Sequence, residues 1–223
     1  FNAPIPTKVV VFRDDVSFNP FKPVLDEGKI DAGVVGYFLT GEEANHIALS
    51  VGGDPAQALQ TIFHEYAHFL VNNNIGDASI PPWFNEGLAE YYSTLRVESD
   101  RIIALGAPPP DYPALLARSR LIPADVFFET DNYTLNQQNE EGSQLYYAQS
   151  WALMHYLLNA DGGARRKQFP IFLNSVMNGK PAREAFSDAF LMDFAAAEKQ
   201  LKKYVERGSY EPVKITLPAK LSA

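Results

Sequence analysis

DPAQALQTIFHEYAHFLVNNNI, residues 54–75, has the pattern of one long helix with an apolar face. Asp54 can cap this helix, Pro55 suits its first position, and Gln57 lies three residues past the cap, where a side-chain amide can bond back to the first turn. Apolar residues then recur at helical spacing as far as Leu70, and the polar run NNNIG ends the helix. The stretch therefore predicts a helix that packs one side against a core.

Segments with the pattern of β-strands precede this helix. KVVVF (8–12) is a short β-branched run, and AGVVGYFL (32–39) and NHIALSV (45–51) are two further apolar runs. TGEEA (40–44) joins the last two and suits a hairpin turn. The sequence therefore predicts a small N-terminal β-sheet.

Helical patterns dominate the rest of the chain. IPPWFNEGLAEYYSTL (80–95) is entered through two prolines, and EEGSQLYYAQSWALMHYLLNADGG (140–163) is a long helix stopped by two glycines. Three shorter helical segments follow between residues 165 and 205, and EPVKITLPAKL (211–221) is extended. Because strands come first and helices follow, the sequence predicts the α+β class with a mostly α-helical C-terminal lobe.

Composition and charge exclude several classes of protein. The chain of 223 residues carries 19 Lys and Arg against 27 Asp and Glu, a net charge of −8 with scattered basic residues, so we expect no nucleic-acid partner. No apolar run approaches the roughly 18 residues that a membrane span needs, so we expect no membrane insertion. Because the chain has no cysteine, any metal ion must be bound by nitrogen and oxygen.

The motif HEYAH supplies the first candidate ligands. His64 and His68 are four residues apart, so on a helix both imidazoles lie on one face and can bind one metal ion. Glu65 points about 100° away and can reach a water molecule at such an ion. The alternative is that two surface histidines share a helix face by coincidence.

Glu86 is the candidate third ligand. It lies 18 positions beyond His68 on the next predicted helix, and an antiparallel return can bring it to the open side of the metal ion. The alternative is a solvated acid near the start of a helix, where negative charge is favoured. The apolar neighbours Trp83, Phe84 and Leu88 favour a largely buried helix instead.

HEYAH followed by WFNEGLAEYY resembles the gluzincin zinc metallopeptidases, and most closely the poorly characterised bacterial members of the peptidase MA-like group. The resemblance extends from residue 8 to residue 205. It implies that Zn²⁺ is the cofactor, that the three residues His64, His68 and Glu86 are its ligands, and that Glu65 is the catalytic base. It also implies a thermolysin-like catalytic domain, with the strand 45–51 as the sheet edge along which an extended peptide lies.

Two further residues are carried over from this resemblance. Glu90 occupies the place of an acid that hydrogen-bonds a zinc-binding histidine in thermolysin-like members, although it could also be a surface glutamate one turn further on. YAQSWALMHYL resembles the helix that carries the transition-state tyrosine of the aminopeptidase members. This likeness assigns that role to Tyr147, with its neighbour Tyr146 as the alternative. We expect His46 and His155 to be structural.

The expected organisation is one gluzincin-like catalytic domain over residues 1–208, followed by an extended tail or linker over 209–223. Within the domain, residues 1–75 form the sheet and the active-site helix, and 76–208 form the helical lobe. The missing initiator Met, the absence of cysteine and the exported members of the family lead us to expect an extracytoplasmic, bacterial protein.

The expected activity is hydrolysis of peptide bonds in peptide or protein substrates by metal-activated water. Aminopeptidase gluzincins carry G-x-M-E-N, whose Glu binds the free α-amine of the substrate, whereas GEEAN (41–45) has Ala44 at that place. We therefore expect an endopeptidase, or an enzyme that recognises the end of its substrate by another device, rather than a typical aminopeptidase. Two alternatives stay open: a catalytically silent zinc-binding domain that recognises a peptide or partner, and a metal-dependent hydrolase of non-peptide amides.

Overall fold

The chain forms two compact units, residues 1–74 and 75–223, in a computed structural model. The predicted α+β class is confirmed, because small sheets and many helices occur together. The structure describes residues 5–22, 24, 34–39, 41–75, 78–136 and 138–218. Parts of the predicted segments 32–39, 40–44 and 211–221 lie outside these described residues.

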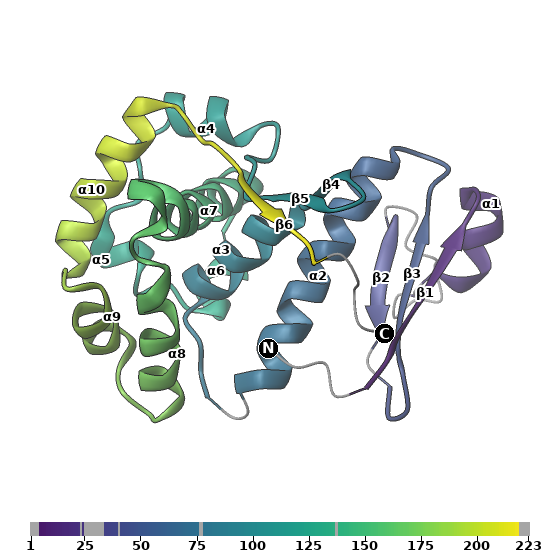
Figure 1. Cartoon of the computed structure of the whole chain (residues 1–223), viewed down its shortest axis with the longest axis horizontal. Coiled ribbons are helices and arrows are strands. Elements are labelled where there is room, and N and C mark those ends of the chain that lie inside the picture. Colours follow the sequence, from purple (N-terminus) through teal and green to yellow (C-terminus); the bar gives the residue numbers. More distant parts are fainter. Residues whose placement is uncertain are drawn as a thin grey trace. The chain divides into compact units, whose positions relative to one another are not determined.

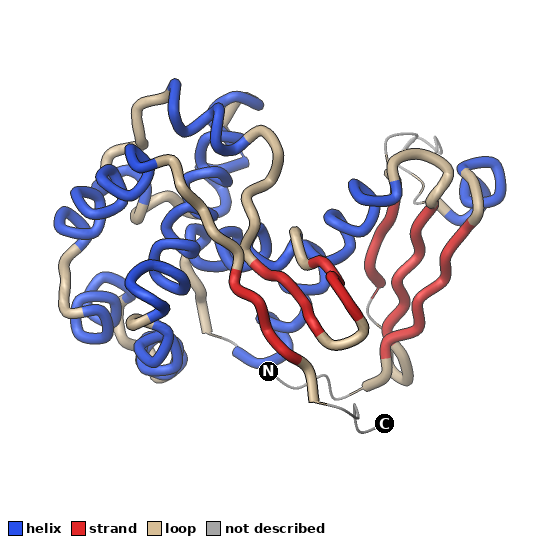
Figure 2. The backbone as a smooth tube through the Cα atoms, turned by 45° about the horizontal axis from the view of Figure 1, so that its top comes forward, coloured by secondary structure: helices blue, strands red, loops and turns tan. Residues whose placement is uncertain are grey.

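The first unit is built on a three-stranded sheet of β1 (Thr7–Phe12), β2 (Gly36–Leu39) and β3 (Asn45–Ser50). β3 lies in the centre, parallel to β1 and antiparallel to β2, as Figures 1 and 2 show. The three predicted strands and the reversal between the last two are therefore confirmed. The expectation that 45–51 forms a sheet edge is wrong, because both sides of β3 are already paired.

Helices cover both faces of this sheet (Figure 1). On one face Ile47 and Leu49 of β3 pack against Ala58 and Ile62 of α2 (Pro55–Ile75). On the other face α1 (Asp15–Phe18) buries Phe18 completely, and its ring lies 5.2 Å from Phe12 and 5.9 Å from Tyr37, both measured between ring centroids. The short helix η1 (Asn19–Phe21) follows α1.

The start of α2 agrees with the sequence prediction. The backbone N–H of Ala56 donates a hydrogen bond of 2.9 Å to the Asp54 carboxylate, and the N–H of Ala58 donates one of 3.1 Å to the Asp54 carbonyl. The side chain of Asp54 thus satisfies a backbone donor that has no partner within the helix. Further along, the ring of Phe69 packs 4.5 Å from Phe38 of β2. These contacts fix which face of α2 meets the sheet.

The second unit is organised around α3 (Pro82–Ser93) and α7 (Glu140–Gly163), which pack along each other. Helical geometry in α7 is interrupted at residues 160–162, where Asp161 and Gly162 have positive φ angles of 55° and 70°. Around this pair lie α4 (Tyr112–Arg118), α5 (Ala124–Phe127), α6 (Asn132–Asn136), η2 (Arg166–Gln168), α8 (Phe169–Met177), α9 (Ala182–Phe190) and α10 (Phe194–Arg207).

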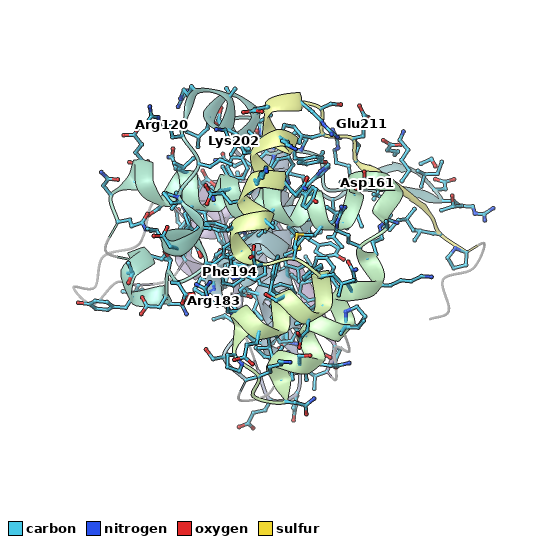
Figure 3. The ribbon with its side chains drawn as sticks, turned by 90° about the vertical axis from the view of Figure 1, so that its left-hand side faces the viewer. Arg120, Asp161, Arg183, Phe194, Lys202 and Glu211 are labelled. Atoms are coloured by element: carbon cyan, nitrogen blue, oxygen red, sulfur yellow. The ribbon has the colours of Figure 1, made fainter. Side chains whose placement is uncertain are left out.

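Aromatic rings form the core of this unit. Trp83 and Phe84 of α3 are fully buried, and Trp83 lies 5.6 Å from Phe172 and 5.7 Å from Phe186 between ring centroids. At the edge of the cluster the guanidinium of Arg183 lies 4.7 Å from the ring of Phe194, and Figure 3 shows these two side chains next to each other. The burial of α3 agrees with the expectation from its apolar neighbours.

A second small sheet consists of β4 (Arg96–Ser99), β5 (Ile102–Leu105) and β6 (Val213–Thr216), all antiparallel, with β5 in the centre. The hairpin of β4 and β5 was not predicted, because β4 is short and fully exposed and so lacks an apolar alternation. β6 comes from the segment expected to be extended, and it pairs with β5. Among the helices that the structure describes, none is long and apolar enough to cross a membrane.

Candidate metal centre

Two imidazoles meet on consecutive turns of α2. The Nε2 atoms of His64 and His68 lie 3.0 Å apart, and the two rings are almost perpendicular, at 83° with centroids 4.6 Å apart. Both side chains are half-buried. Two nitrogen atoms at this distance can share one proton, or they can both face one cation. The predicted pairing of His64 with His68 on one helix face is present.

Glu65 lies between these histidines in the sequence and is exposed on α2. Because successive helical residues are about 100° apart, its carboxylate leaves the helix in a different direction from either imidazole. The opposite side of α2 is anchored by the buried Ile62 and Phe69. This anchoring prevents α2 from rotating about its axis, so the histidine face keeps its direction.

Two carboxylates lie one turn apart on α3 in the second unit. Glu86 is half-buried, and Glu90 is only 9% exposed. Glutamates are seldom buried without partners, so the burial of Glu90 points to a role in a polar site. Because Glu90 is buried, the alternative of a surface glutamate is wrong.

Gly87 explains how α3 meets α7. A Cβ atom at this position would lie 2.6 Å from the carbonyl oxygen of Ser150 on α7, closer than a carbon atom can approach. Glycine is therefore the residue that permits this helix crossing. Because Glu86 precedes Gly87 and Tyr147 lies one turn before Ser150, the close crossing brings the acid and the tyrosine into one region.

Tyr147 has the properties of a hydrogen-bond donor in this region. It is half-buried, and burial first, followed by the charges of Glu86 and Glu90, raises the pKa of its hydroxyl. A raised pKa keeps the phenol protonated at neutral pH, so that it can donate a hydrogen bond. Tyr146, by contrast, is fully buried, with its ring 5.1 Å from Phe127. Burial likewise raises its pKa.

Tyr112, at the start of α4, was not singled out from the sequence. Burial raises the pKa of its hydroxyl, and so does Glu90, through both its charge and a hydrogen bond. Its ring lies 6.1 Å from Trp151 of α7. PPPDYPALL (108–116) reads only as a loop with helical turns, so the sequence carries no signal for this neighbour of Glu90.

The two remaining histidines, His155 and His46, differ in burial. His155 is fully buried, and its Nδ1 lies 2.6 Å from the hydroxyl of Tyr204. Desolvation lowers its pKa to about 4. It is a structural residue, as expected. His46 is exposed on β3.

The chain matches no protein-family model and no curated protein sequence. A site in this chain is therefore inferred from its own residues. The first unit brings His64 and His68 together, and the second unit gathers Glu86, Glu90 and Tyr147 around the crossing of α3 and α7.

Proposed function

We propose that the protein is a zinc-dependent peptidase in which His64, His68 and Glu86 bind one zinc ion. The observation that carries this proposal is the approach of the two Nε2 atoms to 3.0 Å on one face of α2. With Zn–N bonds of 2.0–2.1 Å, two imidazoles on one tetrahedral zinc ion have nitrogen atoms about 3.3 Å apart. The histidine pair therefore fits a shared zinc ion with a small adjustment.

The chemistry of the donors supports zinc as the metal. His64, His68 and Glu86 are the group of described residues that could hold a metal ion, each offering one ligand atom. Two imidazoles and one carboxylate form a common ligand set of catalytic zinc, whereas calcium and magnesium prefer oxygen alone. The absence of cysteine leaves no thiolate ligand to compete with this set.

The side chains around the ligands have the chemistry that hydrolysis needs. Zinc, when bound, polarises a carbonyl and lowers the pKa of a water molecule to about 7. The Glu65 carboxylate accepts the proton of the attacking water and passes it to the leaving amine. The Tyr147 hydroxyl donates a hydrogen bond to the oxygen that becomes negatively charged on the substrate carbonyl. The motif resemblance gives Glu90 the role of orienting one of the zinc-binding histidines.

This assignment agrees with the thermolysin-like domain that the motif resemblance implies. The main alternative, a silent zinc-binding domain that recognises a peptide, would keep the ligands without turnover. The presence of Glu65 on α2 and the protonated Tyr147 favour an enzyme, since a binding domain needs neither. Assay of a random peptide pool by mass spectrometry, with and without a chelator, separates the two.

Zinc titration of the metal-free protein tests the ligands. We expect one tight equivalent per chain for the wild type. Glu86→Ala should lose more zinc affinity than Glu90→Gln, because it removes a ligand. Glu90→Gln removes only a supporting hydrogen bond, and the loss of such a bond lowers metal affinity by about 10–100-fold. Glu211→Ala, an exposed acid remote in sequence, is the matched control. Tight binding in Glu86→Ala would contradict the assignment of that ligand.

Cleavage inside a chain is favoured over removal of single N-terminal residues. Glu42 and Glu43 lie on the exposed turn before β3, and the strands β2 and β3 carry no carboxylate. A desolvated ammonium without a counter-ion would cost several kcal/mol, so the strands offer no anchor for a free α-amine. Matched N-acetylated and free peptides test this point. We expect similar cleavage of both, and a strong preference for the free amine would contradict it.

A further inference from the structure

The two glutamates of α3 lie one turn apart but differ in burial. Glu86 is half-buried, whereas Glu90 is only 9% exposed. Like charges four residues apart on a helix repel each other, and a buried carboxylate is costly unless hydrogen-bond donors compensate its charge. The surroundings of Glu90 therefore need to supply such a donor.

Tyr112 supplies a donor to Glu90 from another helix. The Tyr112 hydroxyl makes a hydrogen bond to the Glu90 side chain. Burial raises the pKa of this phenol most, and the charge of Glu90 and the hydrogen bond raise it further. A protonated phenol facing a carboxylate can only donate, because the carboxylate only accepts. Tyr112 therefore compensates part of the charge of Glu90 from within the second unit.

The backbone at the start of α4 holds Tyr112 in place. The N–H of Tyr112 donates a hydrogen bond of 3.1 Å to the Pro109 carbonyl oxygen, and the N–H of Leu115 donates one of 3.0 Å to that of Asp111. Leu115 and Leu116 are buried, and α4 packs against α7 (Figure 1). The helix start and its buried leucines therefore fix the backbone from which the phenol extends.

The ring of Tyr112 packs against the face of α7 that carries Tyr147. Its centroid lies 6.1 Å from that of Trp151, which is fully buried and follows Tyr147 by one turn. After burial and Glu90, smaller contributions to the raised pKa of Tyr112 come from Tyr147 and Glu86. The phenol therefore lies where α3, α4 and α7 meet, close to both of these candidate site residues.

We propose that Tyr112 is a positioning residue of the candidate metal centre. This role rests on the proposed function, in which Glu86 binds zinc and Glu90 supports one of the histidine ligands. The hydrogen bond from Tyr112 fixes the direction of the Glu90 carboxylate and compensates its charge. It thereby separates the roles of two acids on one helix face: Glu90 is held by a donor of the protein, and Glu86 binds the cation.

Zinc titration of Tyr112→Phe, of Glu90→Gln and of the double variant tests this role. Phenylalanine keeps the ring against Trp151 and removes only the donor. We expect Tyr112→Phe to bind zinc about 10-fold more weakly than the wild type, at the lower end of what partners beyond the ligands contribute. In the Glu90→Gln background the same change should alter zinc affinity by about 2-fold or less, because the charge that the phenol compensates is gone.

Tyr91→Phe is the matched control on α3. The Tyr91 hydroxyl donates a hydrogen bond of 2.8 Å to Oδ1 of Asn159, so this variant also loses one phenol hydrogen bond of the second unit. It should unfold at a lower denaturant concentration than the wild type but bind zinc as tightly. A loss of zinc affinity equal to that of Tyr112→Phe would mean general destabilisation and would overturn the positioning role.

The remaining outcomes separate this role from the proposed function. A wild type that binds no zinc would contradict both. A wild type that binds zinc tightly, with the same affinity in Tyr112→Phe, would overturn the role of Tyr112 alone, as would an equal loss in both backgrounds.

The double variant also decides the matter if Tyr112→Phe does not fold, because it carries no buried charge at position 90. Its zinc affinity must then match that of Glu90→Gln. A further loss of about 10-fold relative to Glu90→Gln would show that the Tyr112 hydroxyl acts on the site without Glu90, and would overturn the proposal.

Discussion

The histidines of α2 and the histidine of α7 occupy opposite kinds of environment. His64 and His68 are half-buried and direct their Nε2 atoms at each other across 3.0 Å. His155 is fully buried, and its nitrogen atoms face a hydroxyl, an amide and a carbonyl. In the first case two ring nitrogen atoms converge on one point. In the second, neutral groups of the protein satisfy the ring.

This difference separates a histidine that suits a cation from one that supports the fold. Two neutral imidazoles facing each other gain more from a shared Lewis acid than from one shared proton, because both lone pairs are then used. A buried imidazole with matched neutral partners gains nothing from a cation, and its burial disfavours a positive charge on the ring. The following experiments test this contrast, in order of decreasing expected effect.

The largest effect is expected for Glu65→Gln. If the α2 pair binds a catalytic zinc ion, removing the general base beside it should lower kcat by about 10²–10⁴-fold, since an amide cannot accept the proton of water. Zinc binding and the fold should be kept, which titration and circular dichroism would show. Turnover near the wild-type level would mean that another residue is the base, or that the cleavage measured comes from a contaminant.

Tyr147→Phe should have the next largest effect, and Tyr146→Phe is its control. Loss of one donor to the developing oxyanion lowers kcat by about 10²–10³-fold, with little change in KM or zinc affinity. Tyr146 is fully buried, so its hydroxyl should affect stability more than turnover. Steady-state kinetics on both variants would decide. If only Tyr146→Phe loses kcat, the neighbouring tyrosine is the oxyanion donor.

Alanine at the two kinds of histidine should give opposite results in thermal or denaturant unfolding. His155→Ala should cost about 2–4 kcal/mol in the free energy of unfolding, because it leaves buried partners unpaired and a cavity. Metal-free His64→Ala should cost about 1 kcal/mol or less. Zinc at 100 times its Kd should stabilise the wild type by about 2.7 kcal/mol but not His64→Ala. Equal zinc stabilisation of both would contradict a site on α2.

Patterns that depend on neighbouring residues were predictable from the sequence. The Asp54 cap, the length of α2 and the shared face of His64 and His68 follow from helical periodicity alone, and the structure agrees with each. The three strands of the first unit were also predictable, since each is a short β-branched or aromatic run between turns. The burial of the helix around Glu86 followed from its apolar neighbours Trp83, Phe84 and Leu88, whereas the burial of Glu90 was left open by the sequence.

Contacts between segments that are distant in the sequence could not be predicted from such patterns. The parallel partnership of β1 with β3, which removes 45–51 from the sheet edge, joins segments separated by more than thirty residues. The β5–β6 pairing, the place of Tyr112 beside Glu90, and the network that ties Asn159 to Glu211 are also contacts between distant residues. Helix and strand periods describe only which face of an element is apolar. Which faces meet depends on how the whole core packs, because the same apolar faces can be paired in several ways and only close packing selects one.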